Sequence, residues 1–156
     1  MRRWLLALAL LGGVVPDAVA GPQPAPVMPS PVPARVQVQV DVVRATRGSG
    51  TIDPRLADEA AALQRTGFQG FVRVDQEVLL LAGGQTGSLV LPDGRTVRVA
   101  LQRHDPVEAQ LQVRAERAGA EPVVTAVTVK RDRAFVLALK TAEPNTALLL
   151  LVEVRY

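Results

Sequence analysis

Few side chains in this sequence have the types and spacing that covalent chemistry needs. The 156 residues include one histidine and no cysteine, which excludes thiol nucleophiles, cysteine-bound metal centres and multi-histidine metal sites. His104 stands next to Asp105, and the serines are Ser30, Ser49 and Ser88, none of them in a Gly-x-Ser-x-Gly motif. This pattern favours a surface histidine in a turn. A hydrolase that uses His104 with Ser49 or Ser88 stays as an alternative.

Two other groups of residues could bind ligands, but each has a simpler interpretation. Residues 83–87 read GGQTG, yet a phosphate-binding loop needs a lysine after its last glycine and a helix after that, and a strand-like SLV follows here. Asp53, Asp58 and Glu59 fit the start of a helix better than a calcium loop. Glycosidase carboxylates come with aromatic sugar platforms, and aromatic residues make up 3% of this chain. We predict no catalytic, cofactor-binding or metal-binding residues, and therefore no enzyme.

The first twenty residues have the pattern of a secretory signal peptide. Two arginines precede an apolar run at residues 4–15 (WLLALALLGGVV), and the small residues Ala18 and Ala20 then precede Gly21. The run is shorter than the roughly 20 apolar residues that span a membrane. We predict cleavage between Ala20 and Gly21 and export to the periplasm, the cell surface or the extracellular medium.

The rest of the chain divides into a linker and one domain. Residues 21–34 (GPQPAPVMPSPVPA) are rich in proline, which favours an extended polyproline II spacer. Residues 35–156 alternate apolar and polar side chains between turns, which predicts a single β-rich domain. The 18 Lys and Arg are interleaved with 15 Asp and Glu, so we do not expect a nucleic-acid partner.

The alternation predicts about eight strands and one helix. The helix is expected over residues 54–66, because Asp53 and Pro54 form a typical helix start and Gly67 a typical stop. The strands are expected at 35–46, 71–81, 88–91, 96–102, 107–117, 123–130, 134–140 and 147–156. The closely spaced turns predict a mainly β fold of the α+β kind: an antiparallel β-sandwich or barrel-like sheet with one short helix after the first strand.

The last predicted strand has two interpretations. Its apolar run at residues 148–152 predicts a core strand that is buried on both faces. Its alternation up to the aromatic Tyr156 also looks like the terminal strand signal of outer-membrane β-barrel proteins. Because such barrels carry two aromatic girdles, which this chain cannot supply, membrane association is the less favoured alternative.

Four segments carry a resemblance to a known family. Residues 35–43 (RVQVQVDVV) resemble the opening strand of the β-domain of secretins, the outer-membrane gate proteins of secretion and pilus machines. Residues 123–130, 134–139 and 148–154 resemble its closing strands. The segment that reaches the membrane in secretins is missing here. The resemblance therefore implies an envelope protein of similar β topology without a pore, and it carries over no functional residue.

Together these features predict an exported, non-catalytic β-rich module that binds another protein of the cell envelope, as part of a secretion or envelope assembly. Strand-edge pairing is the expected mechanism. The first strand is the candidate interaction edge, because Gln37, Gln39 and Asp41 give it a polar face opposite its valines.

Overall fold

Packing divides the chain into two units, Met1–Pro31 and Val32–Tyr156. The structure is a computed structural model that describes residues 21–26, 34–48 and 50–156. In the first unit, residues 21–26 are exposed and form neither helix nor strand. The predicted signal peptide, with Ala18 and Ala20, lies outside the described residues, so cleavage and export stay predictions.

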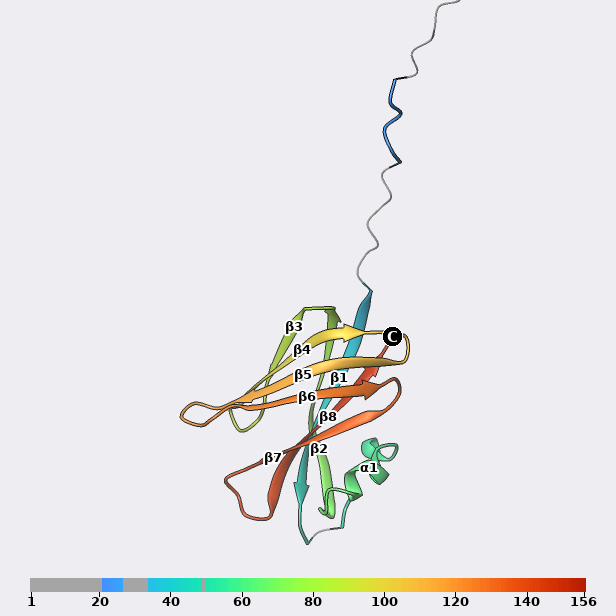
Figure 1. Cartoon of the computed structure of the whole chain (residues 1–156). Coiled ribbons are helices and arrows are strands. Elements are labelled where there is room, and N and C mark those ends of the chain that lie inside the picture. The colour runs from blue at the N-terminus through green and yellow to red at the C-terminus, as the bar shows by residue number, and fades with distance from the viewer. Residues whose placement is uncertain (1–20, 27–33, 49) are drawn as a thin grey trace, which may run out of the picture. The chain divides into compact units, whose positions relative to one another are not determined.

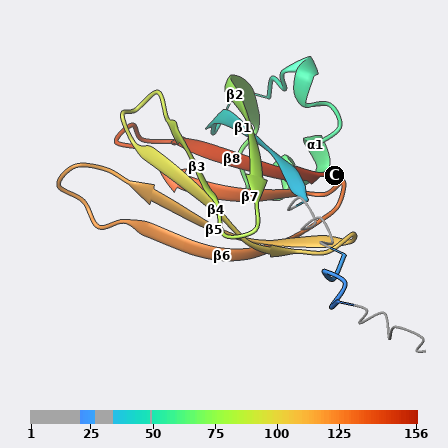
Figure 2. The same cartoon turned by 90° about the horizontal axis from the view of Figure 1, so that it is seen from above.

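The second unit is a β-sandwich (Figures 1 and 2). Among the described residues, eight strands form two antiparallel sheets in the orders β2-β1-β8-β7 and β3-β4-β5-β6. The strands are β1 (Arg35–Thr46), β2 (Gly70–Ala82), β3 (Thr86–Val90), β4 (Thr96–His104), β5 (Glu108–Glu116), β6 (Val123–Lys130), β7 (Ala134–Lys140) and β8 (Thr146–Arg155). Every predicted strand is present, with bounds shifted by at most two residues. The fold class is confirmed as a sandwich; the two sheets do not join into the closed barrel that the outer-membrane alternative requires.

The main core lies between the two sheets. Val36, Val38, Val40 and Val42 of β1 are fully buried against it, as their alternation in sequence predicts. Residues 148–152 of β8 are all buried, because β8 packs against this core with one face and against a second core with the other. The prediction of a strand buried on both faces is confirmed.

The outer face of the first sheet is apolar in one half and polar in the other. In the apolar half, Val43 pairs with Leu149 and Ala45 with Ala147, and these residues belong to the second core. On this face, the apolar residues of β1 lie beside apolar residues of β8. This match arises because the outer face of β1 changes from polar to apolar along the chain, while that of its antiparallel neighbour β8 changes from apolar to polar.

A short helical segment covers the apolar half. It consists of a 3₁₀ turn η1 (Pro54–Leu56) and a helix α1 (Ala60–Gln64), so the prediction of one continuous helix over residues 54–66 is wrong. The break lets Leu56 and Leu63 both reach the second core, where each is fully buried. The segment ends at Gly67, which adopts the positive φ expected of a helix stop. No helix in the described part of the chain is long and apolar enough to cross a membrane.

Candidate functional site

The predicted interaction edge lies inside a sheet. β1 pairs with β2 on one side and with β8 on the other, so the backbone beside Gln37, Gln39 and Asp41 has no unpaired edge. Gln39 and Asp41 are also nearly inaccessible, with 8% and 4% of their surface exposed. The assignment of β1 as an interaction edge is therefore wrong. Alternation tells which residues share a face of a strand, but it does not tell where that strand lies in the sheet.

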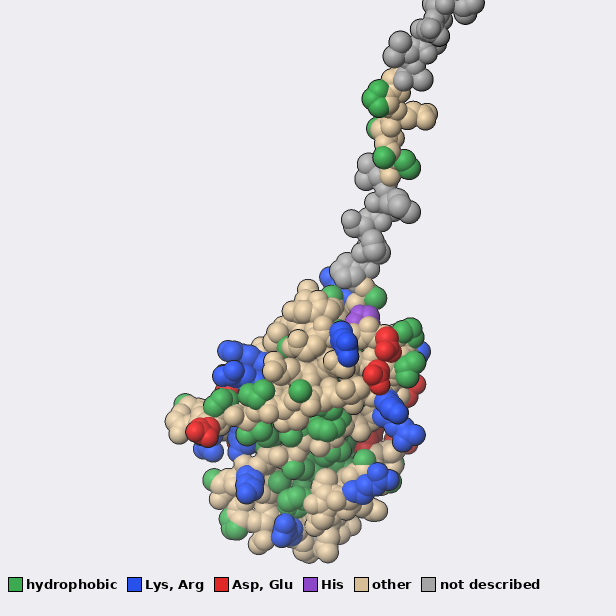
Figure 3. Space-filling model, in the orientation of Figure 1, with side chains coloured by type: hydrophobic (Ala, Val, Ile, Leu, Met, Phe, Trp, Pro, Cys, Tyr) green, Lys and Arg blue, Asp and Glu red, His purple; other side chains and the backbone are tan. Residues whose placement is uncertain are grey.

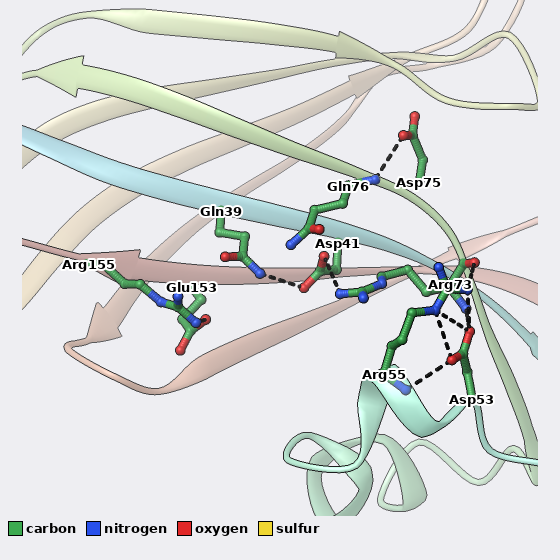
Figure 4. Close-up of polar contacts among 9 residues, drawn as sticks. All are labelled: Gln39, Asp41, Asp53, Arg55, Arg73, Asp75, Gln76, Glu153 and Arg155. Carbon is green, nitrogen blue, oxygen red and sulfur yellow. Dashed lines mark hydrogen bonds and ion pairs between the residues drawn. The ribbon is translucent and has the colours of Figure 1, made fainter.

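Gln39 and Asp41 instead belong to a polar network on the outer face of the first sheet (Figure 4). Gln39 Nε2 donates a hydrogen bond of 3.0 Å to Asp41 Oδ2. The Nη1 of Arg73, on the neighbouring strand β2, lies 3.4 Å from Asp41 Oδ1. A β-bulge shifts the register of β1 and β2 between Val42 and Val43, next to this pair. The buried carboxylate thus has a cation and an amide as partners.

A second carboxylate connects this network to the helical segment. Asp53 caps the 3₁₀ turn, accepting the Arg55 backbone N–H at 3.0 Å, and it forms an ion pair of 2.7 Å with the Arg55 guanidinium. It also accepts the backbone N–H of Arg73 at 3.3 Å (Figure 4). The backbone N–H of Asp53 itself donates to the carbonyl of Phe71. These contacts fix the helical segment to β2. Asp41 is connected to this cap through Arg73, whose side chain pairs with Asp41 and whose backbone N–H bonds Asp53.

The pKa values of Asp53 and Glu59, two acidic residues of this region, shift in opposite directions. Hydrogen bonds from Arg55 hold the pKa of Asp53 well below its usual range. Burial raises the pKa of Glu59, and the nearby charges of Asp41 and Glu153 add to that rise. Ionised Asp53 therefore stabilises the fold, whereas ionised Glu59 opposes it.

We expect Asp53→Asn to weaken the acid dependence of stability. Because the folded-state pKa of Asp53 is depressed, its stabilising effect is complete above the ordinary value of 3.8 and is lost as the pH falls below that value. The variant should be less stable than the parent at neutral pH, and this difference should shrink as the pH falls. Urea unfolding between about pH 2 and pH 7 measures it. Asp58→Asn, at an exposed carboxyl that takes no part in this cap, is the control. A difference that stays constant with pH would contradict the prediction.

The structure does not bring Ser88 and His104 together. Ser88 on β3 lies opposite Arg98 of β4, and His104 lies six residues further along β4, about 20 Å away at the usual rise of a strand. Asp105 accepts the backbone N–H groups of Val107 and Glu108 at 2.7 and 2.9 Å. It therefore shapes the turn before β5. Ser30 and Ser49 lie outside the described residues.

His104 instead packs against the end of the chain. The centre of its ring lies 5.9 Å from that of the Tyr156 ring, and the Arg131 guanidinium lies over the Tyr156 ring, 5.5 Å from its centre. Burial, with the charge of Asp105, raises the pKa of Tyr156. The aromatic end of β8 thus joins the end of the first sheet to the β4–β5 and β6–β7 turns of the second.

The glycine-rich segment is a turn between β2 and β3. Its backbone donors are directed at protein carbonyls: Gly84 N–H bonds Leu101 O at 2.6 Å and Gln85 N–H bonds Ala82 O at 2.9 Å. The same N–H groups are thereby withheld from a phosphate. Within the described ranges, no group of three or more His, Cys, Asp or Glu residues is placed to hold a metal ion.

The sheet edges are β2, β3, β6 and β7. β2 carries a bulge and the charged residues Arg73, Asp75 and Glu77, and β3 has only five residues; such features protect an edge from pairing. β6 and β7 lack these features and carry no charge before the lysine that ends each strand. These two strands are therefore the edges best suited to accept another strand.

β6 and β7 diverge from the turn that joins them (Figure 1). A hollow lined by residues of both strands lies at each end of the opening between them. Phe135 and Leu137 of β7 and Val127 of β6 are half-buried and pack on the main core, which forms the floor of the groove. In Figure 3 the hydrophobic side chains gather in a band along this opening. The groove widens into two hollows of about 400 Å³ each, one beside the turn and one at the far end. We call this feature the β6–β7 groove.

The sequence predicted strands for the residues of β6 and β7 that line the groove, but their exposure was not predicted. The available signal was the absence of charge in residues 134–139 (AFVLAL). A buried central strand and an unprotected edge strand both give this signal, and the sequence of one chain does not distinguish them. Comparison of the chain with models of protein families, with curated proteins and with solved structures finds no match.

Proposed function

We propose that this chain is an exported, non-catalytic module of the cell envelope that binds another protein by strand addition. The observation that carries the proposal is the uncharged edge of β7, which borders an apolar groove and has no strand partner among the described residues. Export rests on the signal-peptide pattern of residues 1–20, and the resemblance to secretin strands favours the same compartment.

Strand addition uses both features of this edge. The backbone N–H and C=O groups on the outer side of β7 pair with the partner backbone, which provides affinity. Alternate side chains of the added strand then cover the groove floor formed by Phe135, Leu137 and Val127. The partner thereby completes the open side of the sandwich, and apolar surface leaves water.

Site-specific photo-crosslinking in intact cells tests the proposal. A photoreactive residue at Ala138, exposed on β7, should yield a defined crosslink to an envelope protein, and mass spectrometry of the product should place the crosslink in one extended segment of that partner. The same residue at Gln112, exposed on the central strand β5, is the matched control and should yield none. Identical products from both positions, or none from Ala138, would contradict binding at β7.

Cell fractionation with N-terminal sequencing tests the other half of the proposal. The protein should be recovered outside the cytoplasm with Gly21 as its first residue. Recovery of the intact, unprocessed chain from the cytosol would contradict export, whatever the crosslinking result.

A further inference from the structure

We infer that the β6–β7 groove selects a partner segment with an apolar centre and acidic residues at both ends. This inference rests on the proposed function, because it specifies the chemistry of the strand that is added to β7. The charges at the two ends of the groove carry it.

Cations stand at both ends of the groove. Lys130 and Arg133 line the hollow beside the turn, and no acidic residue lines that hollow. Arg133 also borders a separate hollow, which four acidic residues line: Asp58, Glu59, Asp132 and Glu153. Arg117 and Lys140 line the far hollow together with one acid, Glu121. A further cation there, Arg95, already pairs with Asp93 and donates a hydrogen bond to the Lys140 carbonyl.

The cations at the ends are available to a ligand. Lys130, Arg133, Arg117 and Lys140 are all exposed, and none of them has an ion pair with another described residue. The middle of the groove contrasts with its ends, because the strands that border it carry only apolar residues and threonines there. A ligand therefore meets an apolar floor with positive charge on either side of it.

The length of the groove matches one strand. β7 has seven residues, which span about 23 Å at the usual rise of a strand. A segment paired along the whole of β7 therefore has its first and last residues beside Arg133 and Lys140. Acidic residues at those two positions, or immediately beyond them, gain attraction at both ends.

The same charges disfavour a second copy of this chain. Two β7 edges that paired antiparallel would bring Arg133 of each copy towards Lys140 of the other. Like charges placed together in this way oppose association. An acidic segment is the occupant that neutralises these positions.

Binding of synthetic peptides to the full processed chain tests the inference. The probe is an extended peptide of alternating valine and threonine with two acidic residues at each end, and the matched peptide has lysines in their place. We expect the acidic peptide to bind about tenfold more tightly, as expected for two exposed ion pairs. The difference should vanish between about 0.01 M and 1 M salt, where the Debye length falls from about 30 Å to about 3 Å. Hydrogen exchange should show that the acidic peptide protects β7 amides.

Charge reversal at the groove provides the second arm. The double variant Arg133→Glu/Lys140→Glu should prefer the lysine peptide. The control Arg35→Glu/Arg103→Glu makes the same change in net charge at exposed residues that line none of the hollows, and it should keep the parent preference. A preference that follows net charge rather than position would contradict the inference.

The outcomes separate this inference from the proposed function. Equal binding of both peptides, with protection of β7, would overturn the acidic preference and leave strand addition standing. Binding of neither peptide would overturn the inference, while crosslinking at Ala138 still decides the proposed function. Concentration-dependent protection of β7 in the protein alone would show that a second copy occupies the groove, which also contradicts the inference.

Discussion

Leu150→Ala is expected to lower the free energy of unfolding by about 2–5 kcal/mol. Leu150 is fully buried in the main core. It lies on β8, which pairs with both β1 and β7, so its surroundings are held on two sides and cannot collapse easily into the space left by the side chain. Urea unfolding measures the loss.

Substitutions of two other leucines, one exposed and one in the second core, are the comparisons for this result. Leu80→Ala removes the same atoms from a side chain that is 61% exposed on the edge strand β2, and it should change stability by no more than about 0.5 kcal/mol. Leu149→Ala lies one residue from Leu150 but faces the second core, and its cost should also fall within about 2–5 kcal/mol. A loss of unfolding free energy well below this range for Leu149→Ala would contradict the tight packing of the helical segment over the sheet.

The strands were predictable because local patterns determine them. Valines at every second position of residues 36–42 could be buried only on one face of a strand, and the double-sided apolar run at residues 148–152 could only be covered on both faces. The turns were predictable as well, since Gly84 and Gly94, the latter in the turn dipeptide Asp93-Gly94, both adopt a positive φ. These features depend on neighbours in sequence.

The order of the strands was not predictable in the same way. β1 pairs with β8, which follows it by about a hundred residues, and no local pattern in either strand indicates that the other is its partner. The polar side chains of β1 therefore suggested a solvent-exposed edge, although Gln39 and Asp41 are buried, bonded to each other and, through Asp41, to Arg73 of β2. The continuous helix failed for a related reason, because a distant sheet surface determines where Leu56 and Leu63 must lie. Long-range packing decided each of these positions.

Arg73→Met is expected to lower the free energy of unfolding by about 1–3 kcal/mol, because it leaves the carboxylate of Asp41 buried without its cation. The side chains of Asp41 and Arg73 are 6% and 18% exposed, so water replaces the lost partner poorly. Arg155→Met is the matched control: its pair with Glu153 lies on the same face, but 51% of the Arg155 side chain is exposed, and the loss should stay below about 1 kcal/mol.

The double variant Asp41→Leu/Arg73→Met separates a missing partner from a missing side chain. Removing both charges leaves no buried carboxylate without a cation, so the double variant should recover most of the stability that Arg73→Met loses. If Arg73→Met costs nothing, the network does not stabilise the fold, which would contradict the structural role given to Asp41 and Arg73. If Arg73→Met loses stability and the double variant recovers it, Asp41 and Arg73 stabilise the fold. The β6–β7 groove, at the opposite edge of the same sheet, then stays the candidate binding surface.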